Sequence, residues 1–131
     1  MRPDEGEILI VEDETLIGFD LADLLADAGY KVNGPYTSVP EALSATERSA
    51  VRLAILDVNL GDGTTSEAIA RRMTERGTPI LFVSGYTSAG SEVLRNFPEA
   101  RQVSKPWDPP ELLRTVAQFI GGKSRLAVAA R

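Results

Sequence analysis

Several polar side chains follow apolar segments at points where they could do chemistry together. Asp57 comes near the end of residues 53–59, whose apolar residues do not alternate with polar ones, which predicts a strand buried on both faces. Gly61 and Gly63 then predict a loop, so Asp57 is expected at the carboxyl end of a strand, where open α/β sheets place their ligand sites. An aspartate here could instead simply cap a turn.

Three further predicted strands also end beside polar residues: residues 8–11 beside Glu12 and Asp13, residues 79–83 beside Ser84, and residues 101–104 beside Lys105. Carboxylates can bind a hard cation or act as nucleophiles, a hydroxyl can donate a hydrogen bond, and an ammonium group can neutralise an anion. The carboxyl ends of parallel strands emerge at one edge of a sheet. These side chains are therefore expected to lie at a common edge.

The elements that position these residues alternate between strand and helix. Apolar spacing predicts a helix over residues 15–28 with Asp13 as its N-cap, and capping-box spacings at residues 38–41 and 64–67 predict the next two helices. The remaining expected elements are an edge strand over residues 30–36, a short helix around residues 93–97 and a last helix from Asp108 to about Ile120. Five alternations predict a single α/β domain with a doubly wound parallel sheet and helices on both faces.

The composition excludes several classes of function. The 131 residues include no cysteine and no histidine, which excludes disulfides, thiol chemistry, Cys/His zinc sites and a histidine general base. A net charge of -5 argues against direct binding of nucleic acid. No apolar run approaches the ~18 residues of a membrane span, and the acidic start has no signal-peptide pattern. We expect a cytoplasmic protein without a membrane partner.

Taken in order, Glu12-Asp13, Asp57, Ser84 and Lys105-Pro106 resemble the residue set of the response-regulator receiver domain of two-component signalling. The resemblance covers residues 6 to 121, so we expect a receiver domain over residues 1–121 and a short, basic, loosely ordered tail over residues 122–131. It implies a flavodoxin-like (βα)5 fold with strand order 2-1-3-4-5. That order makes the first and third strands neighbours.

Neighbouring strands lie ~4.8 Å apart, so this order would crowd three carboxylates into one pocket. Two such charges ~4 Å apart repel by ~4 kcal/mol at an effective dielectric constant near 20, which requires a counter-charge. Mg²⁺ can supply it through oxygen ligands and water. The resemblance implies that Asp13 and Asp57 bind the metal directly, that Glu12 acts mostly through water, and that Asn59 offers its backbone carbonyl.

The resemblance also implies a signalling role. Asp57 would take a phosphoryl group from a partner's phosphohistidine, while Lys105 neutralises charge, Ser84 donates a hydrogen bond and Pro106 supplies the family's cis proline that aims the lysine. Because the chain has no histidine, the donor must be a sensor histidine kinase or a histidine phosphotransfer protein. A downstream protein would read the signal, and a homodimer is left open. Such a domain catalyses only its own phosphorylation and dephosphorylation.

Two departures from the family pattern bear on the switch. Gln102 stands where many receivers carry an aromatic residue that turns inward on phosphorylation. Residues 82–86, Phe-Val-Ser-Gly-Tyr, resemble the Phe-Ala-Thr-Gly-Tyr motif of a receiver subgroup found largely in stand-alone and stress-response regulators. Tyr86 is expected to border the phosphoryl group, where it could slow hydrolysis or replace the missing aromatic residue. The alternative is a tyrosine that only packs on the surface loop.

Other functions fit the sequence less well than a stand-alone phosphoacceptor does. An aspartyl-phosphate phosphatase of the haloacid-dehalogenase kind needs an acid two residues after its nucleophile, and Asn59 cannot serve. A nucleotide-binding fold needs a glycine-rich turn after the first strand, where this chain has Glu12, Asp13 and Glu14. A receiver-like binding module that acts without phosphorylation remains the main alternative.

Overall fold

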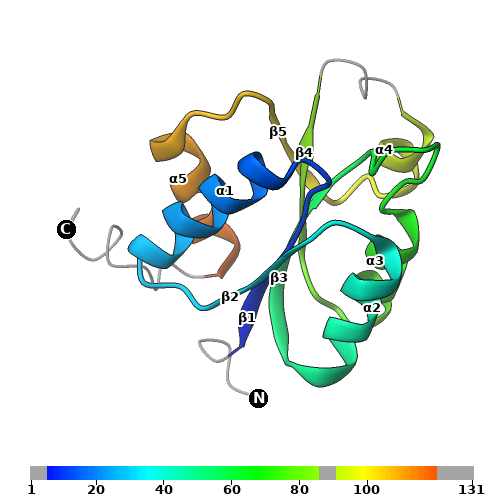
Figure 1. Cartoon of the computed structure of the whole chain (residues 1–131), viewed down its shortest axis with the longest axis horizontal. Coiled ribbons are helices and arrows are strands. Elements are labelled where there is room, and N and C mark those ends of the chain that lie inside the picture. The colour runs from blue at the N-terminus through cyan, green and yellow to red at the C-terminus, as the bar shows by residue number, and fades with distance from the viewer. Residues whose placement is uncertain (1–5, 86–90, 121–131) are drawn as a thin grey trace.

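The strand that carries Asp57 lies at the centre of a five-stranded parallel sheet with the order β2-β1-β3-β4-β5 (Figure 1). The computed structural model describes residues 6–85 and 91–120. Its elements are β1 (Glu7–Val11), α1 (Thr15–Asp27), β2 (Val32–Tyr36), α2 (Val39–Arg48), β3 (Val51–Asp57), α3 (Glu67–Glu75), β4 (Ile80–Ser84), α4 (Glu92–Asn96), β5 (Arg101–Ser104) and α5 (Pro109–Ile120). The expected flavodoxin-like fold is confirmed.

Both faces of the sheet are apolar because side chains alternate along strands that are covered on two sides. In β1, Ile8 and Ile10 pack towards α1 and α5, whereas Leu9 and Val11 pack towards the helices on the other face. Figure 1 shows α1 and α5 on one side of the sheet and α2, α3 and α4 on the other. Two hydrophobic cores therefore hold the central strands in place.

Helices α1 and α2 begin at the predicted residues, but their caps differ from the prediction. Glu14, not Asp13, is the N-cap residue of α1, and its side chain makes no capping hydrogen bond. Ser38 is the N-cap residue of α2, but its hydroxyl donates to the Glu41 carboxylate at 3.0 Å instead of capping a backbone N–H. The predicted Asp13 cap is therefore wrong, which leaves the Asp13 carboxylate available at the sheet edge.

Helix α3 begins at Glu67, later than the capping-box spacing predicted. The loop before it forms its own backbone hydrogen bonds: the Ser66 N–H donates to the Val58 carbonyl at 3.0 Å, and the Leu60 N–H donates to the Thr64 carbonyl at 2.8 Å. These bonds occupy the residues that the prediction assigned to the helix start. Strand β3 ends at Asp57, as predicted.

The predicted start of the last helix is confirmed. The Asp108 carboxylate accepts a hydrogen bond from the Glu111 N–H at 3.2 Å, and α5 runs over Pro109–Ile120. The tail of residues 122–131 lies outside the described residues, so its expected disorder remains a prediction. None of the helices described over residues 6–85 and 91–120 has the length and apolar character needed to cross a bilayer.

Helix α1 approaches the end of β2 through a glycine. A Cβ atom added at Gly18 would lie 2.8 Å from Pro35 Cβ and 3.6 Å from Glu12 Cβ. Real Cβ atoms do not approach so closely, so only glycine lets the helix lie against Pro35 at this distance. The contact places the first turns of α1 directly beside the end of β1.

Candidate functional site

Three carboxylates gather at the carboxyl edge of the sheet. The pairing of Val11 with Leu56 aligns the ends of β1 and β3, so Glu12 and Asp13 emerge next to Asp57. One oxygen from each of the three carboxylates lies within 4.8 Å of the others, with Glu12 and Asp57 buried and Asp13 half-buried. The predicted acidic cluster is confirmed as a geometric feature.

Lys105 enters this cluster from the loop after β5. Its Nζ lies 2.7 Å from Glu12 Oε1, 3.0 Å from Asp57 Oδ2 and 3.6 Å from Glu14 Oε1. The Lys105 backbone N–H donates to the Ser84 carbonyl at 2.9 Å, which ties the loop to the end of β4. The lysine therefore supplies a counter-charge that the sequence reasoning assigned to the metal.

The proton affinities of Glu12 and Lys105 depend on each other. Burial raises the pKa of Glu12 from 4.5 to about 8, and hydrogen bonding with Asp57 adds to the rise while Lys105 opposes it. Burial alone lowers the pKa of Lys105, but its hydrogen bonds with Glu12 and Asp57 outweigh that effect and the pKa is raised. The site thus holds a protonated lysine, and Glu12 takes up a proton more readily than an exposed glutamate.

The cluster has the donor chemistry of a magnesium site. Its three carboxylates offer the oxygen ligands that hard divalent cations prefer, and they lie close enough together to share one ion. The loop after β3 approaches the same place, because a Cβ added at Gly61 would lie 3.4 Å from Asp13 Oδ2. The side chains present therefore fit Mg²⁺.

Comparison with known proteins assigns the family. The model of the response regulator receiver domain matches residues 8–117. The chain belongs to this family. Receiver domains typically bind Mg²⁺ at an acidic cluster, and this receiver has one formed by Glu12, Asp13 and Asp57. The family is a signalling domain of two-component systems and not a conventional enzyme.

Individual relatives agree with this assignment. The solution structure of SdrG from Sphingomonas melonis Fr1 is 30% identical, has a TM-score of 0.77 and is matched over 91% of this chain and 98% of that chain. The regulatory protein VanR of Enterococcus faecium is 34% identical over 113 residues, which are 84% of this chain and 48% of VanR. The transcriptional regulatory protein PdtaR of Mycobacterium tuberculosis is 31% identical over 80 residues, which are 61% of this chain and 39% of PdtaR. The receiver spans less than half the length of these two curated relatives.

The other predicted site residues differ in their burial and in their position relative to the acidic cluster. Ser84 ends β4 and is buried, and Pro106 follows Lys105 through a cis peptide bond, as the resemblance implied. Asn59 lies two residues after Asp57 with an exposed side chain, and it forms an isolated antiparallel bridge with Thr65. Tyr86 lies outside the described residues, so its role stays a prediction.

Sequence reasoning missed Glu14 as part of the lysine's surroundings. It treated Glu14 only as an obstacle to a nucleotide, although the residue directly follows Glu12 and Asp13 at the same strand end. That adjacency could have indicated that Glu14 lies near the acidic cluster. It did not reveal the contact with Lys105, which comes from a distant part of the chain.

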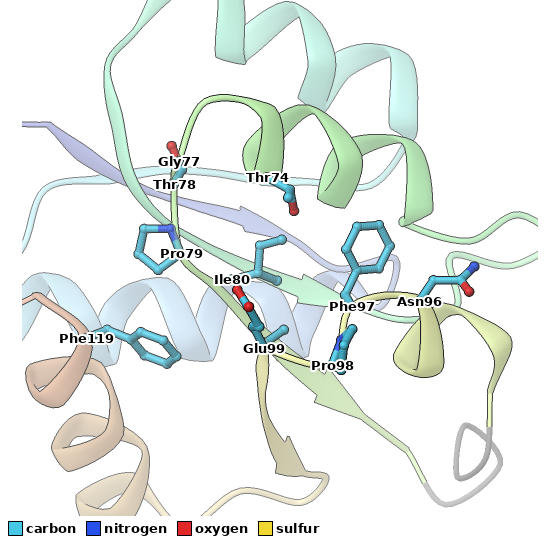
Figure 2. A pocket seen from close by; sticks show the side chains of 11 residues that line it. Thr74, Gly77, Thr78, Pro79, Ile80, Asn96, Phe97, Pro98, Glu99 and Phe119 are labelled. Atoms are coloured by element: carbon cyan, nitrogen blue, oxygen red, sulfur yellow. The ribbon is translucent and has the colours of Figure 1, made fainter.

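Two cavities lie at opposite ends of the sheet. One of about 480 Å³ lies beside Lys105, between α1 and the loop that leads to α5. The other, of about 530 Å³, lies where β4 and β5 begin, and Figure 2 shows Phe97 and Phe119 on either side of Ile80 there. Its position, far along the strands from Asp57, separates the second cavity from the acidic cluster.

Proposed function

We propose that this receiver accepts a phosphoryl group on Asp57 from the phosphohistidine of a sensor histidine kinase or a histidine phosphotransfer protein, with Mg²⁺ at the acidic cluster. One observation carries the proposal: Lys105 Nζ contacts both Glu12 and Asp57 at the carboxyl edge of the sheet. This arrangement combines a carboxylate nucleophile, a cation for the transferred oxygens and the ligands for a metal. The phosphorylated receiver then acts through contacts with a downstream protein.

The transfer needs no separate general base, because Asp57 attacks as a carboxylate. One of its oxygens forms a bond to phosphorus while the bond from phosphorus to the donor's imidazole nitrogen breaks, and the electron pair of that bond stays on the nitrogen. Lys105 neutralises negative charge on the phosphoryl oxygens, and the Ser84 hydroxyl donates a hydrogen bond to one of them. A protonated lysine suits this role because its pKa is raised.

Four residues share the binding of Mg²⁺ in this proposal. Asp13 and Asp57 bind Mg²⁺ directly, Glu12 acts mostly through water, and Asn59 contributes its backbone carbonyl. Bound Mg²⁺ supplies positive charge that lowers the repulsion between the carboxylates and an incoming phosphoryl group. The half-buried position of Asp13 and the approach of the Gly61 loop support this division.

The proposal also concerns the phosphodonor and the receiver subgroup to which the chain belongs. The donor histidine lies outside these 131 residues, because none of them is a histidine. Similarity to SdrG over 98% of that chain and the motif at residues 82–86 support a stand-alone receiver of the Phe-Ala-Thr-Gly-Tyr subgroup. Exposure of Gln102 on β5 agrees with a switch that does not use an aromatic residue at that place.

Intact-mass spectrometry tests the proposal directly. After incubation with Mg²⁺ and acetyl phosphate, the mass should rise by one phosphoryl group, and the increase should vanish with EDTA or in Asp57→Asn. Asp62→Asn is the matched control, because it changes an exposed carboxylate in the neighbouring loop. An unchanged mass of the wild type at saturating donor would instead favour a binding module that acts without phosphorylation. A retained increase in Asp57→Asn would place the acceptor elsewhere.

A further inference from the structure

The cavity beside Lys105 has an acidic entrance. Its lining residues are Glu14, Ile17, Asp20, Gly85, Lys105, Pro106 and Trp107. Among these residues Lys105 is the one cation, and Glu14 and Asp20 are both exposed carboxylates on the α1 side. Lys105, which lines this cavity, also lies 3.0 Å from Asp57, so a phosphodonor that comes to Asp57 from this side meets two negative charges near the lysine.

The positive charge of Lys105 is largely neutralised by carboxylates inside the site. Its Nζ makes its two shortest contacts with the buried Glu12 and Asp57 carboxylates, at 2.7 and 3.0 Å. Glu14 adds a third carboxylate at 3.6 Å, and the Glu14 side chain is 61% exposed. The lysine charge consequently does little to attract an anion from solvent, whereas Glu14 acts on the entrance directly.

Glu14 is held at this position by its own backbone. The Glu14 N–H donates to Glu12 Oε2 at 3.1 Å, and the residue is the N-cap of α1. These contacts fix the backbone of Glu14, and from there its carboxylate reaches to 3.6 Å from Lys105 Nζ. Asp20 projects from the second turn of the same helix into the wall of the cavity.

Helix α1, which carries Ile17 and Asp20 of the cavity lining, also exposes two large apolar side chains. Leu16 and Phe19, one helical turn apart on α1, are 80% and 53% exposed. Ile17 and Trp107 add apolar surface inside the cavity. A protein can cover such a surface and bring positive charge to Glu14 and Asp20, whereas a small free anion gains nothing from the apolar side chains and is repelled by the carboxylates.

We infer that Glu14, assisted by Asp20, makes the phosphoacceptor site selective against small, free, anionic phosphodonors and in favour of a phosphoryl group presented on a basic protein surface. Glu14 acts here as a specificity-determining residue. This inference rests on the proposed phosphorylation of Asp57. It adds a reason why the donor is a protein and not a metabolite anion.

Two small phosphodonors of different charge test the inference. Acetyl phosphate is a dianion near neutral pH, whereas the protonated nitrogen of phosphoramidate offsets part of its charge. At low salt and saturating Mg²⁺, Glu14→Gln should raise the phosphorylation rate with acetyl phosphate by about two- to fivefold, the size expected for a screened charge several ångströms from the donor. The rate with phosphoramidate should rise less, so the ratio of the two rates should increase.

Matched variants show whether a change in the ratio of the two rates comes from charge beside Lys105 or from the net charge of the protein. Asp20→Asn should shift the ratio in the same direction by a smaller amount, and Asp27→Asn, an exposed carboxylate at the far end of α1, should not shift it. Glu14→Lys should shift it further than Glu14→Gln. High salt should bring all the ratios together, because screening removes the charge difference.

The outcomes that oppose the inference are distinct from failure of the proposed function. An equal rise with both donors, or a ratio in Glu14→Gln that matches the wild type, would overturn the role of Glu14. A shift in Asp27→Asn as large as that in Glu14→Gln would overturn it as well, since net charge alone would then explain the data. If the wild type accepted no phosphoryl group from either donor, the proposed function itself would be wrong.

Discussion

Lys105 Nζ lies 2.7 Å from Glu12 Oε1, a closer approach than its 3.0 Å contact with Asp57. The pair joins the end of β1 to the loop after β5, although β3 and β4 lie between those strands in the sheet. Lys105 and the proposed Mg²⁺ would therefore neutralise overlapping sets of carboxylates.

Replacing Lys105 by methionine should make the protein more dependent on Mg²⁺. Without the ammonium group, Glu12 and Asp57 lose their cation, which should lower the free energy of unfolding in metal-free buffer by roughly 3–5 kcal/mol. Added Mg²⁺ should then raise the melting temperature more in Lys105→Met than in the wild type. Thermal unfolding with and without Mg²⁺ measures both effects. Arg101→Met, at an exposed position, is the control, and equal Mg²⁺ shifts would show that lysine and metal act independently.

The pH dependence of stability should report the proton on Glu12. The folded pKa of about 8 exceeds the ordinary 4.5, so the stability linked to this group is fully present below pH 4.5 and is lost as the pH rises through 8. In metal-free buffer the contribution of Glu12 to the free energy of unfolding should therefore fall between pH 4.5 and about 8. The raised pKa of Lys105 affects stability only above its ordinary 10.5, outside this range.

Glu12→Gln provides the comparison for that experiment, because the amide cannot titrate. Urea unfolding at several pH values should show a smaller decrease in the variant than in the wild type. Parallel curves for the two proteins would contradict a raised pKa at Glu12.

Asp57→Asn should stabilise the metal-free protein while it abolishes phosphorylation. The substitution removes a charge that raises the pKa of Glu12 and leaves Lys105 with its shorter contact to Glu12. We expect a gain of about 1 kcal/mol, which corresponds to roughly 3–5 °C in melting temperature for a domain of this size. Calorimetry in EDTA checks this, and a lower melting temperature would argue against crowding of the carboxylates.

Gly18→Ala should destabilise the fold even though alanine is the better helix former. The new Cβ would lie 2.8 Å from Pro35 Cβ, so α1 or the end of β2 must move, at a cost of about 1–3 kcal/mol. The double variant Gly18→Ala with Pro35→Gly removes the colliding atoms. Its unfolding free energy should exceed the value expected from adding the two single effects. Strict additivity in this double-mutant cycle would mean that the two residues do not meet.

Local patterns in the sequence were sufficient to place the strands and their polar ends. Unbroken apolar runs before Glu12, Asp57 and Ser84 predict strands covered on both faces, because any exposed face would select polar residues at every second position. The start of α5 was also predictable, since the Asp108 side chain caps the helix within three residues. The strand order, by contrast, came from the family resemblance and not from periodicity.

The tertiary structure alone decided how the charges pair. No local pattern links Glu12 to Lys105, because their contact depends on the order and register of the strands between them. The displaced start of α3 depends on loop hydrogen bonds to Val58, and the glycine at position 18 is explained only by Pro35 across the fold. Sequence periodicity reports which face of an element is buried, whereas the partner of a buried charge is set by distances between elements that are remote along the chain.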